Sequence, residues 1–163
     1  MLRKIGIIAV LSLMALALAA VPALAQNPHI VVPGTATEDQ AAGTVTVSGF
    51  KVAGLGSEEI RVELTATGVA QVECTNPGGN VAPGQDTTVD AAAEPLTLLP
   101  DRRGNVTLPS ITTAPAPDPD PAVVCPSDKW DANIVSVDFS TATLSIFQPA
   151  TDTTPVLTQT FNL

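Results

Sequence analysis

Alternation of apolar and polar residues constrains this chain more than any other feature. In residues 59–67, read EIRVELTAT, Ile60, Val62 and Leu64 fall on one side and the polar residues on the other. Residues 44–52, TVTVSGFKV, follow the same period of two. Successive side chains of a strand point to opposite faces of a sheet, so this pattern predicts strands with one buried and one wetted face. Such strands are typical of antiparallel sheets.

Further strands are predicted wherever a short apolar or alternating run is bounded by turn-forming residues. These runs fall at residues 69–74, 96–99, 105–113, 134–139, 143–148 and 156–163. Turns are predicted at 54–56 and 140–142, a hairpin turn at 100–104, and a loop at 75–85. No stretch has the period of an amphipathic helix. About seven to nine short strands without helices predict an antiparallel β-sandwich of immunoglobulin-like type, with a small closed β-barrel as the alternative.

The N-terminal residues predict export from the cytoplasm. Arg3 and Lys4 precede an apolar run at residues 5–20, and the Ala-Leu-Ala triplet at 23–25 matches the small-x-small pattern of a signal-peptide cleavage site. We therefore expect residues 1–25 to be removed and the protein to be secreted. The alternative is an uncleaved membrane anchor, which Pro22 and the small residues disfavour.

The remaining chain has the length of one domain. Residues 26–42 predict an extended lead-in, in which residues 30–32 add a short edge strand, and residues 43–163 predict a single β-sandwich domain. Within it, residues 114–122 (APAPDPDPA) have proline at alternate positions. Alternating proline is incompatible with a helix or a central strand, so this segment predicts a polyproline-like connector.

Cys74 and Cys125 are the two cysteines of the chain. In an exported protein they predict one disulfide, with two free thiols as the alternative. Closing a loop of about 50 residues would stabilise the fold by roughly 4 kcal/mol. The sequence leaves open whether the bond joins two strands or a strand to a loop.

The charge balance excludes whole classes of partner. The full chain has a formal net charge of −9, and without Arg3 and Lys4 it becomes 5 − 16 = −11. Phosphate backbones and anionic membrane surfaces attract clustered Lys and Arg, so we expect neither nucleic acid nor membrane as a partner. The acidity instead favours a soluble, monomeric protein.

Candidate catalytic residues are scarce. His29 is the single histidine and lies in the predicted lead-in, so a serine-protease-like triad or a histidine-based zinc site is not expected. Glu58 and Glu59 stand at the start of a predicted strand, and we expect them to be exposed to solvent rather than to act as the paired catalytic carboxylates of a glycosidase. Asn105 begins an Asn-Val-Thr glycosylation sequon. We expect no enzyme and no cofactor.

Calcium is the metal that the loop residues favour most, because it accepts flexible, oxygen-rich coordination. Solvated aspartates that only add solubility are the alternative interpretation, and no EF-hand spacing is present. The calcium candidates are Asp118, Asp120, Asp128 and Asp131.

Two segments carry a resemblance to a known group of proteins. CTNPGGNVAPGQ begins at Cys74, and CPSDKWDANIVSVDFSTATLSIFQ begins at Cys125. Together they resemble small exported microbial proteins with a C-x-N-P-G-G-N-x-x-P-G-Q motif followed by C-P-x-x-x-W. The resemblance covers residues 49–148 and implies a secreted, disulfide-bonded β domain, without implying an activity.

These observations favour a secreted, non-enzymatic structural or interaction module. Its partner would be an extracellular protein or glycan. The alternative is an extracellular module that binds calcium or a surface glycan through its Asp-rich or Gly- and Asn-rich loops.

Overall fold

The computed structural model describes residues 27–163, so the predicted signal peptide at 1–25 lies outside the described residues. The described chain is built from antiparallel strands and one short helical turn. In chain order these elements are β1 (His29–Asp39), β2 (Thr44–Ala53), β3 (Ile60–Thr75), β4 (Val81–Pro83), β5 (Thr87–Ala92), β6 (Leu96–Leu98), β7 (Val106–Thr107), β8 (Ile111–Thr112), α2 (Pro121–Val124), β9 (Asp131–Phe147) and β10 (Leu157–Asn162).

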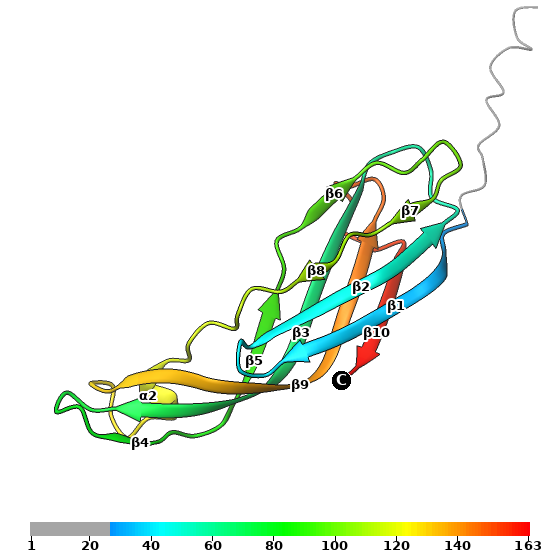
Figure 1. Ribbon diagram of the computed structural model, residues 1–163. Helices are drawn as coiled ribbons and strands as arrows, with labels where there is room; N and C mark the ends of the chain where they lie inside the picture. Colours follow the sequence, from blue (N-terminus) through cyan, green and yellow to red (C-terminus); the bar gives the residue numbers. More distant parts are fainter. Residues whose placement is uncertain (1–26) are drawn as a thin grey trace, which may run out of the picture.

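Two sheets face each other (Figure 1). The four-stranded sheet has the order β1-β2-β7, with β8 also paired to β2. The six-stranded sheet has the order β10-β9-β3-β4, with β5 and β6 also paired to β3. The prediction of an all-β, antiparallel, two-sheet fold is therefore confirmed.

The core lies between the inward faces of the two sheets. Val45 and Val47 on β2 are fully buried, as the alternation of that strand predicts, and the alternation changes phase at Gly49, so that Phe50 is fully buried as well. They belong to the same apolar cluster as Leu64 on β3 and Leu144 on β9. Each buried aliphatic side chain contributes about 1.5–3 kcal/mol of transfer free energy, so the chain builds its core with few aromatic residues.

β3 and β9 are long continuous strands of 16 and 17 residues, and the prediction that each would be two strands is wrong. Their pairing has register shifts at 67/68 and 71/72 of β3, which leave Ser140 and Val135 as extra residues on β9. Ser140 and Thr141 thus lie at a bulge, where the sequence predicts a turn. A bulge bends a strand and increases its twist without ending it.

The turn at residues 100–104 connects the two sheets. It was predicted as a hairpin turn, but β6 before it pairs with β3, and β7 after it pairs with β2. The predicted return strand at 105–113 is divided into β7 and β8. Pro109 lies in the gap between them, where it has no ladder hydrogen bond to break.

Asp101 organises this turn through its carboxylate. Oδ1 accepts the backbone N–H groups of Arg103 and Asn105 at 2.8 Å each, and Oδ2 accepts the Asn105 side-chain amide at 3.1 Å. Hydrogen bonds from the backbone and side chain of Asn105, together with the backbone N–H of Arg103, hold the pKa of Asp101 below its usual value. The predicted sequon residue Asn105 is thus part of a hydrogen-bonded turn.

Asp101→Asn is expected to reduce the acid sensitivity of the fold. A carboxyl whose pKa is lowered by folding stabilises the native state above its unfolded pKa of 3.8, and this contribution disappears as the pH falls through the folded value. Urea unfolding at pH 7 and at a series of pH values below 4 would measure it. The variant should lose less stability than the wild type on acidification, and equal losses would contradict this role.

The N-terminal lead-in is a full edge strand. β1 spans eleven residues and pairs with β2 along nearly its whole length, with a register shift between Ile30 and Val32. The short strand predicted at 30–32 is the start of this longer element. Burial alternates through residues 35–39 as in a strand, but these residues are mostly polar and contain no apolar run that would predict one.

Side-chain contacts close the sandwich at the end where β9 terminates. Buried Gln148 accepts the N–H of Gly56 and donates to the carbonyl of Glu58, both at 2.9 Å. Arg61 stacks its guanidinium 4.2 Å from the ring centroid of Phe147. The two Gln148 bonds hold the β2–β3 loop against the end of β9, at the opposite end of the molecule from α2 (Figure 1).

Candidate interaction site on the disulfide-linked arm

The C-terminal part of β3 and the N-terminal part of β9 extend beyond the four-stranded sheet as an arm (Figure 1). We define the arm as residues 70–86 and 118–137, which include β4 and α2, and we call the other described residues the body. β3 and β9 remain paired there from Ala70↔Val137 to Thr75↔Asp131. The arm is therefore continuous with the sandwich through two hydrogen-bonded strands.

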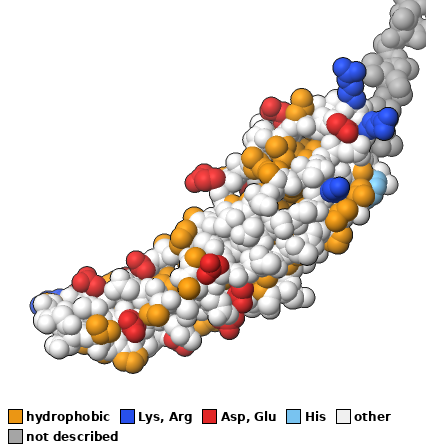
Figure 2. Space-filling model, viewed as in Figure 1, with side chains coloured by type: hydrophobic (Ala, Val, Ile, Leu, Met, Phe, Trp, Pro, Cys, Tyr) orange, Lys and Arg blue, Asp and Glu red, His pale blue; other side chains and the backbone are white. Residues whose placement is uncertain are grey.

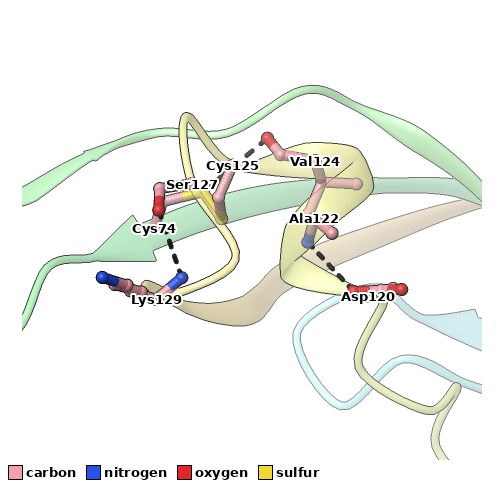
Figure 3. The surroundings of a disulfide bond; sticks show 7 residues. All are labelled: Cys74, Asp120, Ala122, Val124, Cys125, Ser127 and Lys129. Carbon is pink, nitrogen blue, oxygen red and sulfur yellow. Dashed lines mark hydrogen bonds between the residues drawn. A yellow bond between two sulfur atoms is a disulfide. The ribbon is translucent and has the colours of Figure 1, made fainter.

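The Cys74–Cys125 disulfide closes the arm, as the sequence predicts. Cys74 is fully buried in β3, and Cys125 directly follows α2, so the bond joins a strand to the end of a helical turn (Figure 3). The Cys74 Sγ also lies 3.7 Å from the Val124 carbonyl oxygen. Because both sulfurs are oxidised, neither is a thiol nucleophile or a thiolate metal ligand.

The predicted loop at 75–85 contains a hairpin. Asn76 Oδ1 accepts the N–H groups of Gly78 and Asn80 at 2.9 Å each, and this local bonding is typical of Asn in a tight turn. The chain then returns as β4, which pairs with residues 73–75 of β3. The Gly- and Pro-rich sequence therefore forms a tight turn followed by a short edge strand.

Gly84 allows the segment after β4 to pass close to the disulfide. Its N–H donates to the Val72 carbonyl at 2.8 Å, and the N–H of Gln85 donates to the Val124 carbonyl at 2.8 Å. A Cβ at Gly84 would lie 2.9 Å from the Cys74 Sγ. The absence of a side chain at Gly84 thus lets β3, α2 and this segment pack together.

The proline-rich connector ends in helix α2, which corrects the prediction of a wholly polyproline-like segment. Asp120 caps the turn by accepting the N–H of Ala122 at 2.9 Å (Figure 3). Pro121 stands at the start of the helix, where its missing N–H is not needed. Val124 is buried, so the turn covers the core of the arm.

A surface hollow of about 360 Å³ lies beside β4. Its walls include Val81 and Val135, which are 59% and 48% exposed, and the buried Val72. Glu73 and Asp86 also line it, and no Lys or Arg does among the described residues. The hollow thus combines exposed aliphatic side chains with negative charge. Sequence reasoning missed it, because Val81 was assigned to a loop and Val135 to a regular strand.

The four calcium candidates do not converge. Asp120 caps α2, Asp128 accepts the Ser127 hydroxyl at 3.3 Å, and Asp118 accepts the N–H of Ile134 at 3.2 Å. Asp118 and Asp131 line a second hollow of about 550 Å³. Within residues 27–163 no group of three or more His, Cys, Asp or Glu side chains is placed to hold a metal ion.

His29 lies at the start of β1, exposed, with its Nδ1 2.9 Å from the Asn27 carbonyl oxygen. Glu59 is exposed and directly precedes β3. Glu63 points outward from β3, and its Oε1 lies 2.8 Å from the Arg61 Nε. These side chains are on the body, away from the arm.

Figure 2 shows acidic side chains spread over the body and the arm on the face drawn. Lys and Arg side chains gather mainly at the end of the body far from the arm. Among the described residues, no helix is long and apolar enough to cross a membrane.

Comparison with family models, with curated proteins and with solved structures found no match for this chain. The resemblance to small exported microbial proteins therefore stays a prediction.

Proposed function

We propose that this protein is a secreted, non-enzymatic interaction module of immunoglobulin-like type, which binds an extracellular protein through its arm. The observation that carries the proposal is the hollow beside β4, which two exposed valines and two acidic residues line together. Exposed apolar residues grouped on a rigid element are typical of protein-binding surfaces. The disulfide and the β3–β9 ladder supply the rigidity.

The charge of the hollow points to the chemistry of the partner. Glu73 and Asp86 line the hollow without a neighbouring cation from the described chain. Complementary charge across an interface speeds association and suppresses wrong partners. A segment that presents Lys or Arg next to an aliphatic side chain fits both the charge and the apolar walls.

Site-specific photo-crosslinking in the producing cells tests this proposal. A photoreactive amino acid in place of Val81 or Val135 is expected to give one defined crosslinked product outside the cytoplasm. Val69 is the matched control, because it is an exposed valine (47%) of β3 on the sandwich body. Asp86→Lys reverses one charge of the hollow and is expected to reduce the yield at Val81 several-fold.

Crosslinking at the arm positions and not at Val69, with a loss on Asp86→Lys, supports the proposal. No product at Val81 or Val135, or equal products at all three positions, contradicts binding through the arm.

A further inference from the structure

β10 forms the edge of the six-stranded sheet, on the body and away from the arm. It pairs with β9 from Leu157↔Ile146 to Asn162↔Thr141. Neither β10 (LTQTFN) nor the six residues of β9 that pair with it (TATLSI) contain a charged side chain. In a chain with sixteen acidic residues, this edge is an uncharged region.

The other edges of the described sheets are protected against pairing with another chain. β1 has an irregularity between Ile30 and Val32, Pro33 in its interior, and two acidic residues at its end. β4 has three residues and ends in a proline, while β5 contains Asp90. Bulges, prolines, charges and short length are the devices by which natural proteins block sheet edges.

The β9–β10 pairing ends at Thr141, and the preceding residues of β9 donate hydrogen bonds to the segment around the end of β1 instead. The N–H of Val137 donates to the Gln40 carbonyl at 2.9 Å, and the N–H of Phe139 donates to Glu38 Oε2 at 3.1 Å. Among the described strands longer than three residues, β10 alone has an unpaired edge that lacks a charge, a proline and a bulge.

Backbone groups of β10 face outward at alternate residues. The N–H of Leu163 donates to the Ser140 carbonyl of β9 at 3.2 Å, so the antiparallel alternation turns the N–H and C=O of Thr158, Thr160 and Asn162 away from β9. The Thr160 carbonyl accepts the side-chain amide of its neighbour Gln159 at 2.8 Å. A local side chain thus occupies a position where a further strand would donate.

We infer that a second copy of this chain pairs with β10, edge to edge and antiparallel, to join two six-stranded sheets across a two-fold axis. A symmetric pair about an axis normal to the sheet places inward-facing residues opposite inward-facing residues. With the axis at Gln159, Leu157 lies opposite Phe161 of the second copy, and Thr158 lies opposite Thr160. Apolar residues then meet apolar ones, and hydroxyls meet hydroxyls.

Charge restricts where two copies of this acidic chain can meet. Two copies that each have a net charge of −9 repel each other over most of their surfaces. Like charges directly opposite each other destabilise cross-strand pairs. Contact at the uncharged β10 avoids placing such charges opposite each other. The inference departs from the monomer expected from composition. It also concerns a surface separate from the arm, so it stands or falls independently of the proposed function.

Sedimentation equilibrium of the purified protein, from micromolar to millimolar concentration, tests the inference. The wild type is expected to reach twice the mass of the chain. Thr160→Lys places two lysines close together across the axis and is expected to weaken dimerisation by about tenfold or more. Thr88→Lys is the matched control, because Thr88 is an exposed threonine of β5 at the opposite edge of the same sheet.

A mixture of Thr160→Lys and Thr160→Glu chains provides a rescue, because opposite charges then meet across the axis. The mixture should form heterodimers that are tighter than either homodimer. A wild type that stays monomeric throughout, equal dissociation by Thr88→Lys, or no rescue in the mixture would each overturn the inference.

Discussion

Replacing both Cys74 and Cys125 by alanine is expected to lower the free energy of unfolding by about 4 kcal/mol. The disulfide closes a loop with a sequence separation of 51 residues, and its loss restores the conformational freedom of that loop in the unfolded chain. Chemical denaturation monitored by circular dichroism would measure the loss. A typical domain has about 5–15 kcal/mol in total, so the variant should remain folded but lose a large share of its stability.

Reduction of the wild type is the control for this experiment, since it removes the cross-link and keeps both side chains. The reduced wild type and the double alanine variant should unfold at similar denaturant concentrations. If both unfolded at the same concentration as the oxidised protein, the disulfide would have no part in stability.

Gly68→Ala is expected to cost about 3 kcal/mol, because it overpacks a site between two backbones. A Cβ at Gly68 would lie 2.6 Å from the Asp138 carbonyl oxygen and 2.8 Å from the Phe139 Cα. These are backbone atoms of β9, so the two central strands must separate at the bulge that bends them. The loss is measured by the shift in the midpoint of urea unfolding at constant slope.

Gly78→Ala is the matched control, because Gly78 also lies outside the left-handed region of φ. A Cβ there would meet the Asn76 Oδ1 at 3.2 Å, so this side-chain atom needs to shift by only a few tenths of an ångström and can keep its bonds to the N–H groups of Gly78 and Asn80. We expect a change within about 0.5 kcal/mol, as for most surface substitutions. Equal stability of Gly68→Ala and the wild type would mean that β3 and β9 do not approach so closely.

The strands that the sequence predicts best are those whose burial alternates. Ile60, Val62 and Leu64 are buried, and their polar neighbours are not, because a period of two is imposed by strand geometry itself. The continuity of β9 was not predictable in the same way. The small residues Ser140, Thr141 and Ala142 are compatible with a bulge as well as with a turn, and the pairing partner on β3 decides between them.

Sheet membership and the candidate site depended on contacts distant in sequence. The Asp101 turn is encoded locally, but nothing within residues 100–104 indicates that the next strand joins the other sheet. The cysteine pairing followed from their number and the predicted export. The hollow between Val81 and Val135 did not, because it arises from the pairing of β4 with β3 and from the extra residue in β9.

Amide hydrogen exchange, read residue by residue in the oxidised protein and in the double alanine variant, tests most directly whether the disulfide keeps the arm rigid. In the oxidised protein we expect slow exchange both in the β3–β9 ladder of the arm, around Val72 and Cys74, and in the body, around Leu64 and Leu144. In the variant the arm should lose its protection while the body keeps most of its own. Unchanged protection in the arm, or an equal loss in both regions, would contradict a rigid arm maintained by the disulfide.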